Sequence, residues 1–465
     1  MPIPRDDEVC RLSAWEIARL VRRRRLSPVE VVRAHIQRAE VYNPTLNAYI
    51  ALYREEALQE ARRLEGEGWQ GAWRGPLHGV PIALKDVFPM AGRPLTAGSR
   101  LLRAHVPQGD AAVVRRLKAA GAVVLGTVNL HEFAYGVTTV NPHYGPTRNP
   151  WDTSRIPGGS SGGSGAALAA GLCPLSLGTD TGGSVRIPAA LCGVVGLKPT
   201  YGKVSRQGVF PLAWSLDHVG PMARTVRDVA LLLEVLWEGD GPHPPFLREV
   251  EKGVKGVVLG VLTGGIFTLV DTEVEGAFVG ALHALEGLGV RLEEVSWPGT
   301  EAAIAAHTAI LMAEAAAIHE GWLKERPQEY GEDVRRRLLL GMTVPTSLYL
   351  KAQQVRRQVL RDLLSLLERV DALVLPTCPV TAPPIGAERV SIGGRTLDVG
   401  AALTRFVSPF NLTGVPALSV PCALTHQGLP VGFQIVGRFL AEPLLLRIGA
   451  AVEREVLGRP LHPPL

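Results

Sequence analysis

The sequence predicts an α/β fold in which helices cover a largely buried sheet. Short apolar runs of strand length recur along the chain, and helix-like stretches separate most of them, which is the pattern of helices layered on a sheet. Of the 465 residues, 46% are hydrophobic and 20% are charged, which suffices for one large domain or about two or three average ones. No repeat of fixed period occurs, and we expect one large domain (1–465).

Helices are expected first, in a segment from about residue 12 to 63. The stretches SAWE (13–16) and SPVE (27–30) both fit a capping box, in which a serine and a glutamate three residues later close the start of a helix. The second also has proline at the first helical position, where its missing N–H costs nothing. The glycine-rich stretch GEGWQGAWRG then ends the helical pattern.

Strands are expected in the apolar runs that follow. They span residues 80–84, 122–125, 175–177, 194–197, 257–261, 372–375, 417–420 and 431–436. The stretch EGDGPHPPF (238–246) is rich in Gly and Pro and is the best candidate for a seam between domains. Because strands are expected on both sides of it, we interpret it as a loop within one domain.

The charge balance gives no indication of a nucleic-acid partner. The chain has 49 basic and 44 acidic side chains, a net charge of +5, which is small for its length. The one basic run, RRRR (22–25), we interpret as a solvated face rather than an RNA or membrane contact.

Cysteine and histidine spacing gives no sign of a disulfide framework or a metal. The five cysteines are odd in number, far apart and without a CxxC pair, which predicts free thiols in a reducing cytoplasm. The N-terminal stretch lacks the apolar core of a signal peptide, and no segment has ~18 uninterrupted apolar residues, so no membrane span is expected. The twelve histidines show no HExxH or similar ligand spacing, and we expect no metal and no cofactor.

The run GGSSGGSG (158–165) contains three serines among five glycines. A flexible linker is a poor interpretation, because a second Gly-Ser cluster, GTDTGGSVRIP (178–188), follows closely. A phosphate-binding loop needs a lysine, and none occurs between Lys118 and Lys198. The GxSxG pattern of a hydrolase elbow matches at both Ser160 and Ser161, but an elbow requires a strand leading into it, and NPWDTSRIP does not read as one. The sequence still allows the interpretation that one of these serines is a nucleophile outside such an elbow.

A serine hydroxyl needs a base to become a nucleophile. Histidine is the usual base, yet none occurs between His143 and His218. Lysine can replace it when its amine is neutral, and Lys85 ends the apolar run VPIALK, where a lysine is out of place. Taken alone, a lysine whose amine reaches solvent from the end of a strand is the simpler interpretation.

Three stretches taken together resemble the amidase signature family: GVPIALKD around Lys85, GGSSGGSGAALAAG (158–171) and GTDTGGSVRIPAALCGVVGLKPTYG (178–202). Ser160 and Ser184 lie 24 residues apart, the separation of that family's two catalytic serines. Residues 131–151, 204–226, 375–386 and 411–422 also resemble family segments. The resemblance covers residues 12–453 approximately, with a signature core at about 78–226. It implies one large α/β domain with a mixed central sheet surrounded by helices.

The resemblance also implies a function and a catalytic set. The protein would be an amidase that hydrolyses a carboxylic acid amide to the acid and ammonia or an amine through a serine acyl-enzyme. Ser184 would be the nucleophile, Ser160 a bridging serine preceded by a cis peptide bond, and Lys85 the base. For that role burial must lower the lysine pKa from ~10.4 to ~7–8.

The remaining site residues belong to the loop around the nucleophile. The family takes its oxyanion donors from this loop, here the backbone N–H groups of Thr181, Gly182, Gly183 and Ser184. We expect Asp180 and Arg186 to hold the loop rather than to take part in the chemistry. Ser161 is expected either to adjust hydrogen bonds around the serines or simply to bond its own backbone, and Ser164 to cap the helix that follows.

The family includes stand-alone amidases and the glutaminase subunit of a tRNA-dependent amidotransferase. That subunit normally continues from its nucleophile as Ser-Ile-Arg-Gln-Pro, whereas this chain reads SVRIP (184–188). It also carries an acidic residue shortly before the NLxGxP segment, and ALTRFVSPFN (402–411) contains none. We therefore favour a stand-alone amidase and keep the glutaminase of the amidotransferase as the alternative.

Two further interpretations stay open. One is a non-catalytic scaffold that retains the fold, although the intact lysine and serine set weighs against it; the other is an esterase side activity through the same acyl-enzyme. The partner expected is a small-molecule amide, bound around residues 133–137, Trp214 and residues 305–350. Nucleic acid and membrane are not expected, and a homodimer is left open.

Overall fold

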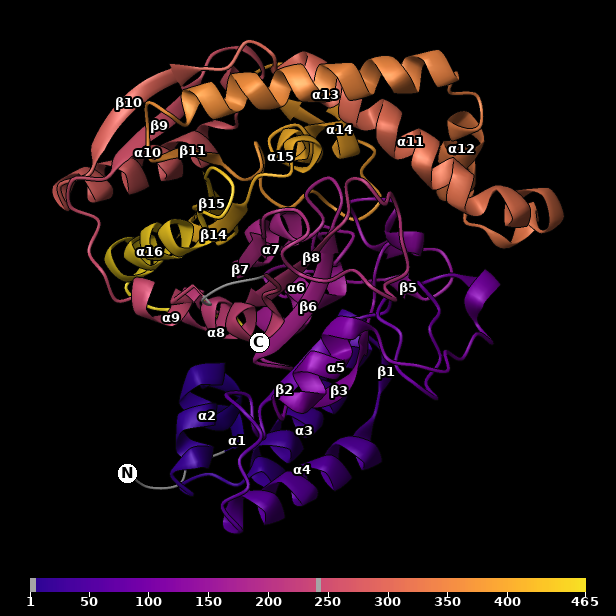
Figure 1. Cartoon of the computed structure of the whole chain (residues 1–465), viewed down its shortest axis with the longest axis vertical. Coiled ribbons are helices and arrows are strands. Elements are labelled where there is room, and N and C mark those ends of the chain that lie inside the picture. Colours follow the sequence, from indigo (N-terminus) through magenta and orange to yellow (C-terminus); the bar gives the residue numbers. More distant parts are fainter. Residues whose placement is uncertain (1–5, 240–243) are drawn as a thin grey trace.

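An eleven-stranded mixed sheet runs through the molecule and organises the fold (Figure 1). The computed structural model describes residues 6–239 and 244–465. In spatial order the strands are β1 (Tyr49–Leu52), β3 (Val123–Val128), β2 (Pro81–Lys85), β6 (Leu175–Asp180), β8 (His218–Ala223), β7 (Val195–Lys198), β14 (Ala417–Leu424), β15 (Pro430–Val436), β11 (Ala372–Pro376), β9 (Val258–Thr263) and β10 (Arg291–Ser296).

The sheet mixes parallel and antiparallel pairs, as expected. Strand β2 runs parallel to both β3 and β6, and β9 runs parallel to both β10 and β11. The other six pairs are antiparallel. Strands from before and after residues 240–243 share this one sheet, so the single large α/β domain is confirmed. Residues 240–243 of the seam considered at 238–246 lie outside the described residues.

All eight predicted strands lie in this sheet, with ends shifted by a few residues, and the other three strands of the sheet were not predicted. Strand β10, RLEEVS, forms one edge of the sheet and is largely exposed, so it lacks an apolar run. Strand β1 forms the other edge and interrupts the predicted N-terminal helical segment. Strand β8 contains Gly220 and Pro221, residue types that weaken a strand pattern.

Helices surround the sheet (Figure 1). They are α1 (Asp6–Arg11), α2 (Ala14–Arg22), α3 (Pro28–Leu46), α4 (Arg54–Trp69), α5 (Ala112–Ala119), α6 (Gly162–Ala169), α7 (Arg186–Cys192), α8 (Val226–Leu236), α9 (Phe246–Glu249), α10 (Thr272–Gly287), α11 (Thr300–Glu325), α12 (Glu332–Gly341), α13 (Thr346–Leu366), α14 (Val399–Thr404), α15 (Ser408–Thr413) and α16 (Glu442–Val452). Two short hairpins, β4 (Val140–Asn141) with β5 (Gly145–Pro146) and β12 (Arg389–Ile392) with β13 (Arg395–Asp398), lie outside the large sheet.

Both predicted N-terminal capping boxes are present. The Ser13 and Ser27 side chains accept backbone N–H groups at the starts of α2 and α3, and Glu16 and Glu30 reach back to the serine backbones. Each box satisfies amide groups that the first turn of a helix leaves without partners. The capping-box pattern therefore predicted both helix starts correctly.

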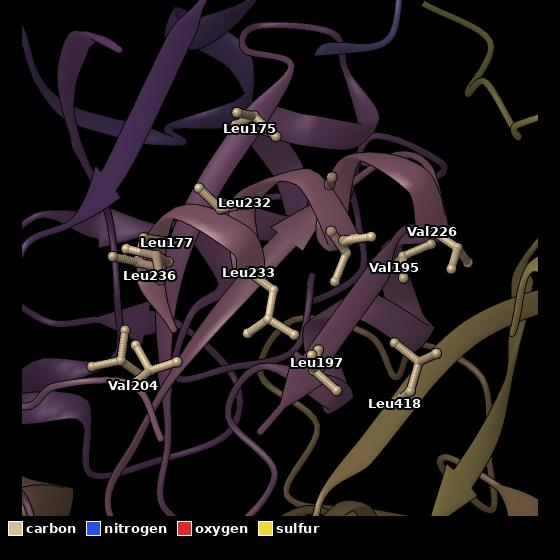
Figure 2. Close-up of a cluster of buried hydrophobic side chains, with 14 of the residues drawn as sticks. Leu175, Leu177, Val195, Leu197, Val204, Val226, Leu232, Leu233, Leu236 and Leu418 are labelled. Atoms are coloured by element: carbon tan, nitrogen blue, oxygen red, sulfur yellow. The ribbon is translucent and has the colours of Figure 1, made fainter. Parts of the chain in front are cut away.

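The core lies on both faces of the sheet. On one face, leucines of α8 pack against β6, β7 and β14 (Figure 2); the side chains include Leu175, Leu177, Val195, Leu197, Leu232, Leu233, Leu236 and Leu418. On the other face, α3 and α6 pack against β2, and Ala83 belongs to the core on that side. Since side chains alternate along a strand, Lys85 points to the same face as Ala83.

Helices α11, α12 and α13 form a helical layer at the top and right of Figure 1. Of the helices in the described ranges, α11 alone is long and apolar enough to cross a membrane by length and composition. Half of its most apolar window is buried, and the helix packs against α12, α13 and α15. Its apolar side chains therefore pack against neighbouring helices within the fold.

Candidate active site

Lys85 is the last residue of β2, and its amine is fully buried. The Nζ atom lies 2.6 Å from Ser160 Oγ and 2.8 Å from Thr179 Oγ1. Burial lowers the pKa of Lys85 from 10.5 to about 7, although Asp180 and Asp217 act in the opposite direction. At neutral pH a large fraction of this amine is neutral and able to accept a proton, and it does not reach solvent as an ordinary strand-end lysine would.

The glycine-rich run brings Ser160 to Lys85. The peptide bond between Gly159 and Ser160 is cis, as the family resemblance implied, and Ser160 O accepts the backbone N–H of His131 at 3.2 Å. Gly158 has φ +81°, a conformation that favours glycine. At Gly163 a Cβ would lie 2.3 Å from Asn129 O, so only glycine fits there. The glycines thus serve a close-packed loop, not a linker.

Ser161 joins this run to the loop that carries Ser184. Its backbone N–H donates to Ser184 O at 3.1 Å. Its hydroxyl donates to Thr179 O at 3.2 Å and accepts the Thr179 N–H at 3.3 Å. Ser161 therefore bonds other segments rather than its own backbone, and it holds the two serine loops side by side.

The expected role of Ser164 as a helix cap is wrong. Helix α6 already begins at Gly162, so Ser164 lies inside its first turn. The Ser164 hydroxyl is buried and has no hydrogen-bond partner among the described residues. Glycine-rich sequence carries few helix-start signals, which is why the boundary was misplaced by three residues.

Asp180 and Arg186 form a buried ion pair against the loop around Ser184. Asp180 accepts the backbone N–H groups of Gly183 at 2.8 Å and Val185 at 3.1 Å. It also pairs with the Arg186 guanidinium at 3.0 Å, both side chains being fully buried. Burial alone would raise the pKa of Asp180, but Arg186 and Asn411 hold it well below its usual range. The loop is thus wrapped around a charged carboxylate.

The backbone N–H groups of this loop differ in their availability. The Gly183 N–H is taken by Asp180. In the part of the chain that the structure describes, the N–H groups of Thr181, Gly182 and Ser184 donate to no acceptor. Ser184 itself is 5% exposed. Three of the four predicted donors therefore have no acceptor within the described residues, and the fourth is already engaged.

Three residues near the site carried no signal in the sequence. Thr179 bonds the Lys85 amine, Asp217 accepts the Thr181 hydroxyl at 2.6 Å, and His307 lies 2.8 Å from Thr181 O through its Nε2 atom. Thr179 lies within GTDTGGSVRIP and Asp217 within residues 204–226, but neither was singled out there; His307 lies on α11, far along the chain. No local pattern could have linked it to the serine loops.

A cavity of about 420 Å³ borders the site. Thr179 and Asp217 form part of its lining, together with Ala134, Phe210 and Trp214. Ala134 and Trp214 belong to regions that were expected to line the substrate pocket. Both line this cavity, whereas Lys85, Ser160 and Ser184 do not. Residues 305–350 do not line this cavity; in the described chain they approach the site through His307.

Similarity to known proteins identifies the family of this chain. A family model described as Amidase matches residues 30–446. The chain belongs to the amidase signature family. Family membership identifies it as an amide-hydrolysing enzyme and agrees with the resemblance seen in its three motifs.

Individual relatives span both branches of the family. The A subunit of glutamyl-tRNA(Gln) amidotransferase from Symbiobacterium thermophilum is 42% identical, over 98% of this chain and 99% of that protein. A crystal structure described as an amidase is 40% identical with a TM-score of 0.90, covering 96% of this chain and all of the other. The structure of the corresponding amidotransferase chain from Thermotoga maritima is 36% identical with a TM-score of 0.80, covering 96% and 95%.

Proposed function

We propose that the chain hydrolyses the C–N bond of a carboxamide through an acyl-enzyme on Ser184, with Ser160 and Lys85 relaying the proton. The observation that carries this proposal is the Lys85 amine, buried, 2.6 Å from Ser160 Oγ. Its pKa of about 7 is close to the working pH, which is where a general base is most effective. A lysine placed only for stability gains nothing from such a shift.

The reaction proceeds in two stages. Neutral Lys85 accepts a proton from Ser160, Ser160 accepts one from Ser184, and the Ser184 oxygen attacks the amide carbon. The proton returns through the same relay to the nitrogen, which leaves as ammonia or an amine. Water then attacks the acyl group on Ser184 by the same route and releases the acid.

The free backbone N–H groups of Thr181, Gly182 and Ser184 are proposed to stabilise the oxyanion that forms in both stages. A single donor of this kind is typically worth ~3 kcal/mol of barrier. Asp180, by taking the Gly183 N–H and the Arg186 guanidinium, keeps the loop in one conformation. Ser161 supports the same geometry through its bond to Ser184 O.

Two substrate classes remain candidates. The curated relatives favour glutamine as substrate and a role within a tRNA-dependent amidotransferase, more strongly than they favour the stand-alone amidase that the motifs suggested. One observation favours the stand-alone amidase. Residues 399–410 approach the nucleophile loop, since Arg186 Nη1 donates to Val407 O at 3.1 Å. They contain no carboxylate to bind the amino group of glutamine.

Ammonia release by the purified chain distinguishes these candidates. We expect release from at least one of glutamine, short aliphatic amides, aromatic amides and amino-acid amides. Ser184→Ala should abolish it, while Ser164→Ala, which removes a buried hydroxyl without a partner in the described chain, should not. Turnover of a simple amide by the chain alone supports the stand-alone amidase. Release from glutamine only, and only with partner proteins added, supports the amidotransferase role; activity retained by Ser184→Ala would refute the proposal.

The setting proposed for this reaction is the cytoplasm. All five cysteines are buried, and none forms a disulfide within the described residues, which fits a reducing compartment. Whether a second copy of the chain assembles with it is testable by light scattering of the purified protein.

A further inference from the structure

His307 of α11 contacts the nucleophile loop directly. Its Nε2 atom lies 2.8 Å from Thr181 O, and its ring packs against Gly182, where an added Cβ would lie 3.0 Å from His307 Cε1. The side chain is buried, and burial lowers the pKa of His307 to about 4, although the bond to Thr181 acts in the opposite direction. The ring is therefore neutral at neutral pH, and because a carbonyl only accepts, Nε2 carries the proton that it donates to Thr181 O.

This bond determines the direction of a neighbouring amide. Thr181 C=O and Gly182 N–H belong to one peptide unit, and that unit is trans, since the single cis bond in the described ranges joins Gly159 to Ser160. In a planar trans unit the C=O and N–H point in opposite directions. Holding Thr181 O toward His307 therefore turns the Gly182 N–H away from it. That N–H has no acceptor among the described residues.

The other anchors of the loop leave this peptide unit unheld. Thr181 is fixed through its hydroxyl by Asp217, at 2.6 Å, and Gly183 through its N–H by Asp180, at 2.8 Å. Neither bond involves the C=O or the N–H between Thr181 and Gly182. Gly182 has no Cβ to restrict rotation, so this unit can turn unless something binds it. His307 supplies that bond.

We propose that His307 is a positioning residue for amide hydrolysis, holding the Thr181–Gly182 peptide so that the Gly182 N–H stabilises the oxyanion on the substrate. This inference rests on the proposed function and extends it to a residue on a separate helix. No hydrogen bond joins His307 to the serines or to Lys85 in the described chain, so it acts through the peptide. A misdirected donor weakens stabilisation of the transition state while leaving substrate binding largely intact.

Paired substitutions at position 307 test this role. His307→Leu removes the donor with limited loss of volume, and His307→Gln retains a donor N–H at a similar reach. Deleting an oxyanion donor outright costs about 10²–10³ in kcat, and misdirecting one should cost about 10- to 100-fold. We expect His307→Leu to lower kcat by that factor with KM nearly unchanged, and His307→Gln to recover most of it. The pH dependence of kcat should be unchanged in both.

A control separates positioning from general destabilisation. His35→Leu removes another buried histidine, on α3 and far from the site, and should lower Tm without lowering kcat. Should His307→Leu fail to fold, the rate at which a fluorophosphonate modifies Ser184 is compared in His307→Gln and His307→Asn. Labelling of Ser184 should be at least about tenfold slower in His307→Asn, because the donor of the shorter asparagine side chain falls short of Thr181 O.

These experiments distinguish failure of the role given to His307 from failure of the proposed function. A His307→Leu variant within about twofold of the unmodified protein in kcat, a glutamine variant as impaired as the leucine variant, or equal labelling of the glutamine and asparagine variants would each overturn the role of His307 alone. An unmodified protein that neither turns over an amide nor reacts with the fluorophosphonate would overturn the proposed function, and this inference with it.

Discussion

Replacing Lys85 by methionine should abolish amide hydrolysis and also change how folding stability depends on pH. The pKa of Lys85 is about 7 in the folded protein against 10.5 for an unperturbed side chain. A basic group with a lowered pKa loses its proton more readily in the folded state. Stability is therefore unaffected above pH 10.5, falls as the pH drops toward 7, and below 7 carries the full penalty, at most about 5 kcal/mol.

The measurable part of this effect lies between pH 9 and pH 7. Over that range the unmodified protein should lose about 2 kcal/mol of unfolding free energy relative to Lys85→Met. Methionine also leaves the hydroxyls of Ser160 and Thr179 without the amine, which costs about 1–3 kcal/mol. That cost is the same at both pH values, so it cancels in the comparison.

Urea unfolding at pH 7 and pH 9 provides the assay, with Lys255→Met, at an exposed lysine, as the control. The control should follow the unmodified protein at both pH values. Identical pH dependence in Lys85→Met and the unmodified protein would show that Lys85 is charged in the folded state, and would refute the base assignment. Lys85→Arg adds a kinetic test: a guanidinium stays protonated, so near-normal turnover would show that a fixed positive charge suffices.

Two further substitutions test the loops around the serines. Asp180→Ala leaves Arg186 buried without its partner and should lower the unfolding free energy by about 3–5 kcal/mol in urea unfolding; a loss below about 1 kcal/mol would contradict the structural role given to this pair. Gly163→Ala drives a Cβ against Asn129 O and should lower Tm and turnover together. Gly66→Ala in α4, with open space around it, should instead leave both unchanged or raise Tm slightly; equal behaviour of the two glycine variants would contradict the close packing of the run.

Most of the buried strands were predictable because they are apolar runs between turns or helices, as in PIAL and VGFQIV. The buried strand β8 was not, because Gly220 and Pro221 interrupt its pattern. Strand β10 was not, because as an exposed edge strand its sequence RLEEVS is mostly polar. The order of strands in the sheet also depends on contacts between residues far apart in the chain, which local patterns do not encode.

The site residues also divide into those that the sequence predicted and those that it did not. Lys85 stood out as a charge at the end of an apolar strand, and Ser160 and Ser184 stood out through their glycine-rich surroundings and the family resemblance. Thr179 and His307 did not, because a threonine in a strand and a histidine in a long apolar helix are unremarkable until the fold brings them to the loops. Ser164 was misread because local sequence did not locate the start of α6.

Ser184 is the proposed nucleophile, on which the whole reaction depends. Incubation with a fluorophosphonate, followed by mass spectrometry of the intact protein and of its peptides, measures this directly. We predict one adduct per chain, on Ser184, none in Ser184→Ala, and a labelling rate that rises with pH through about 7, where Lys85 loses its proton. An adduct on Ser161 or Ser160, or undiminished labelling of Ser184→Ala, would contradict the assignment of Ser184 as the nucleophile.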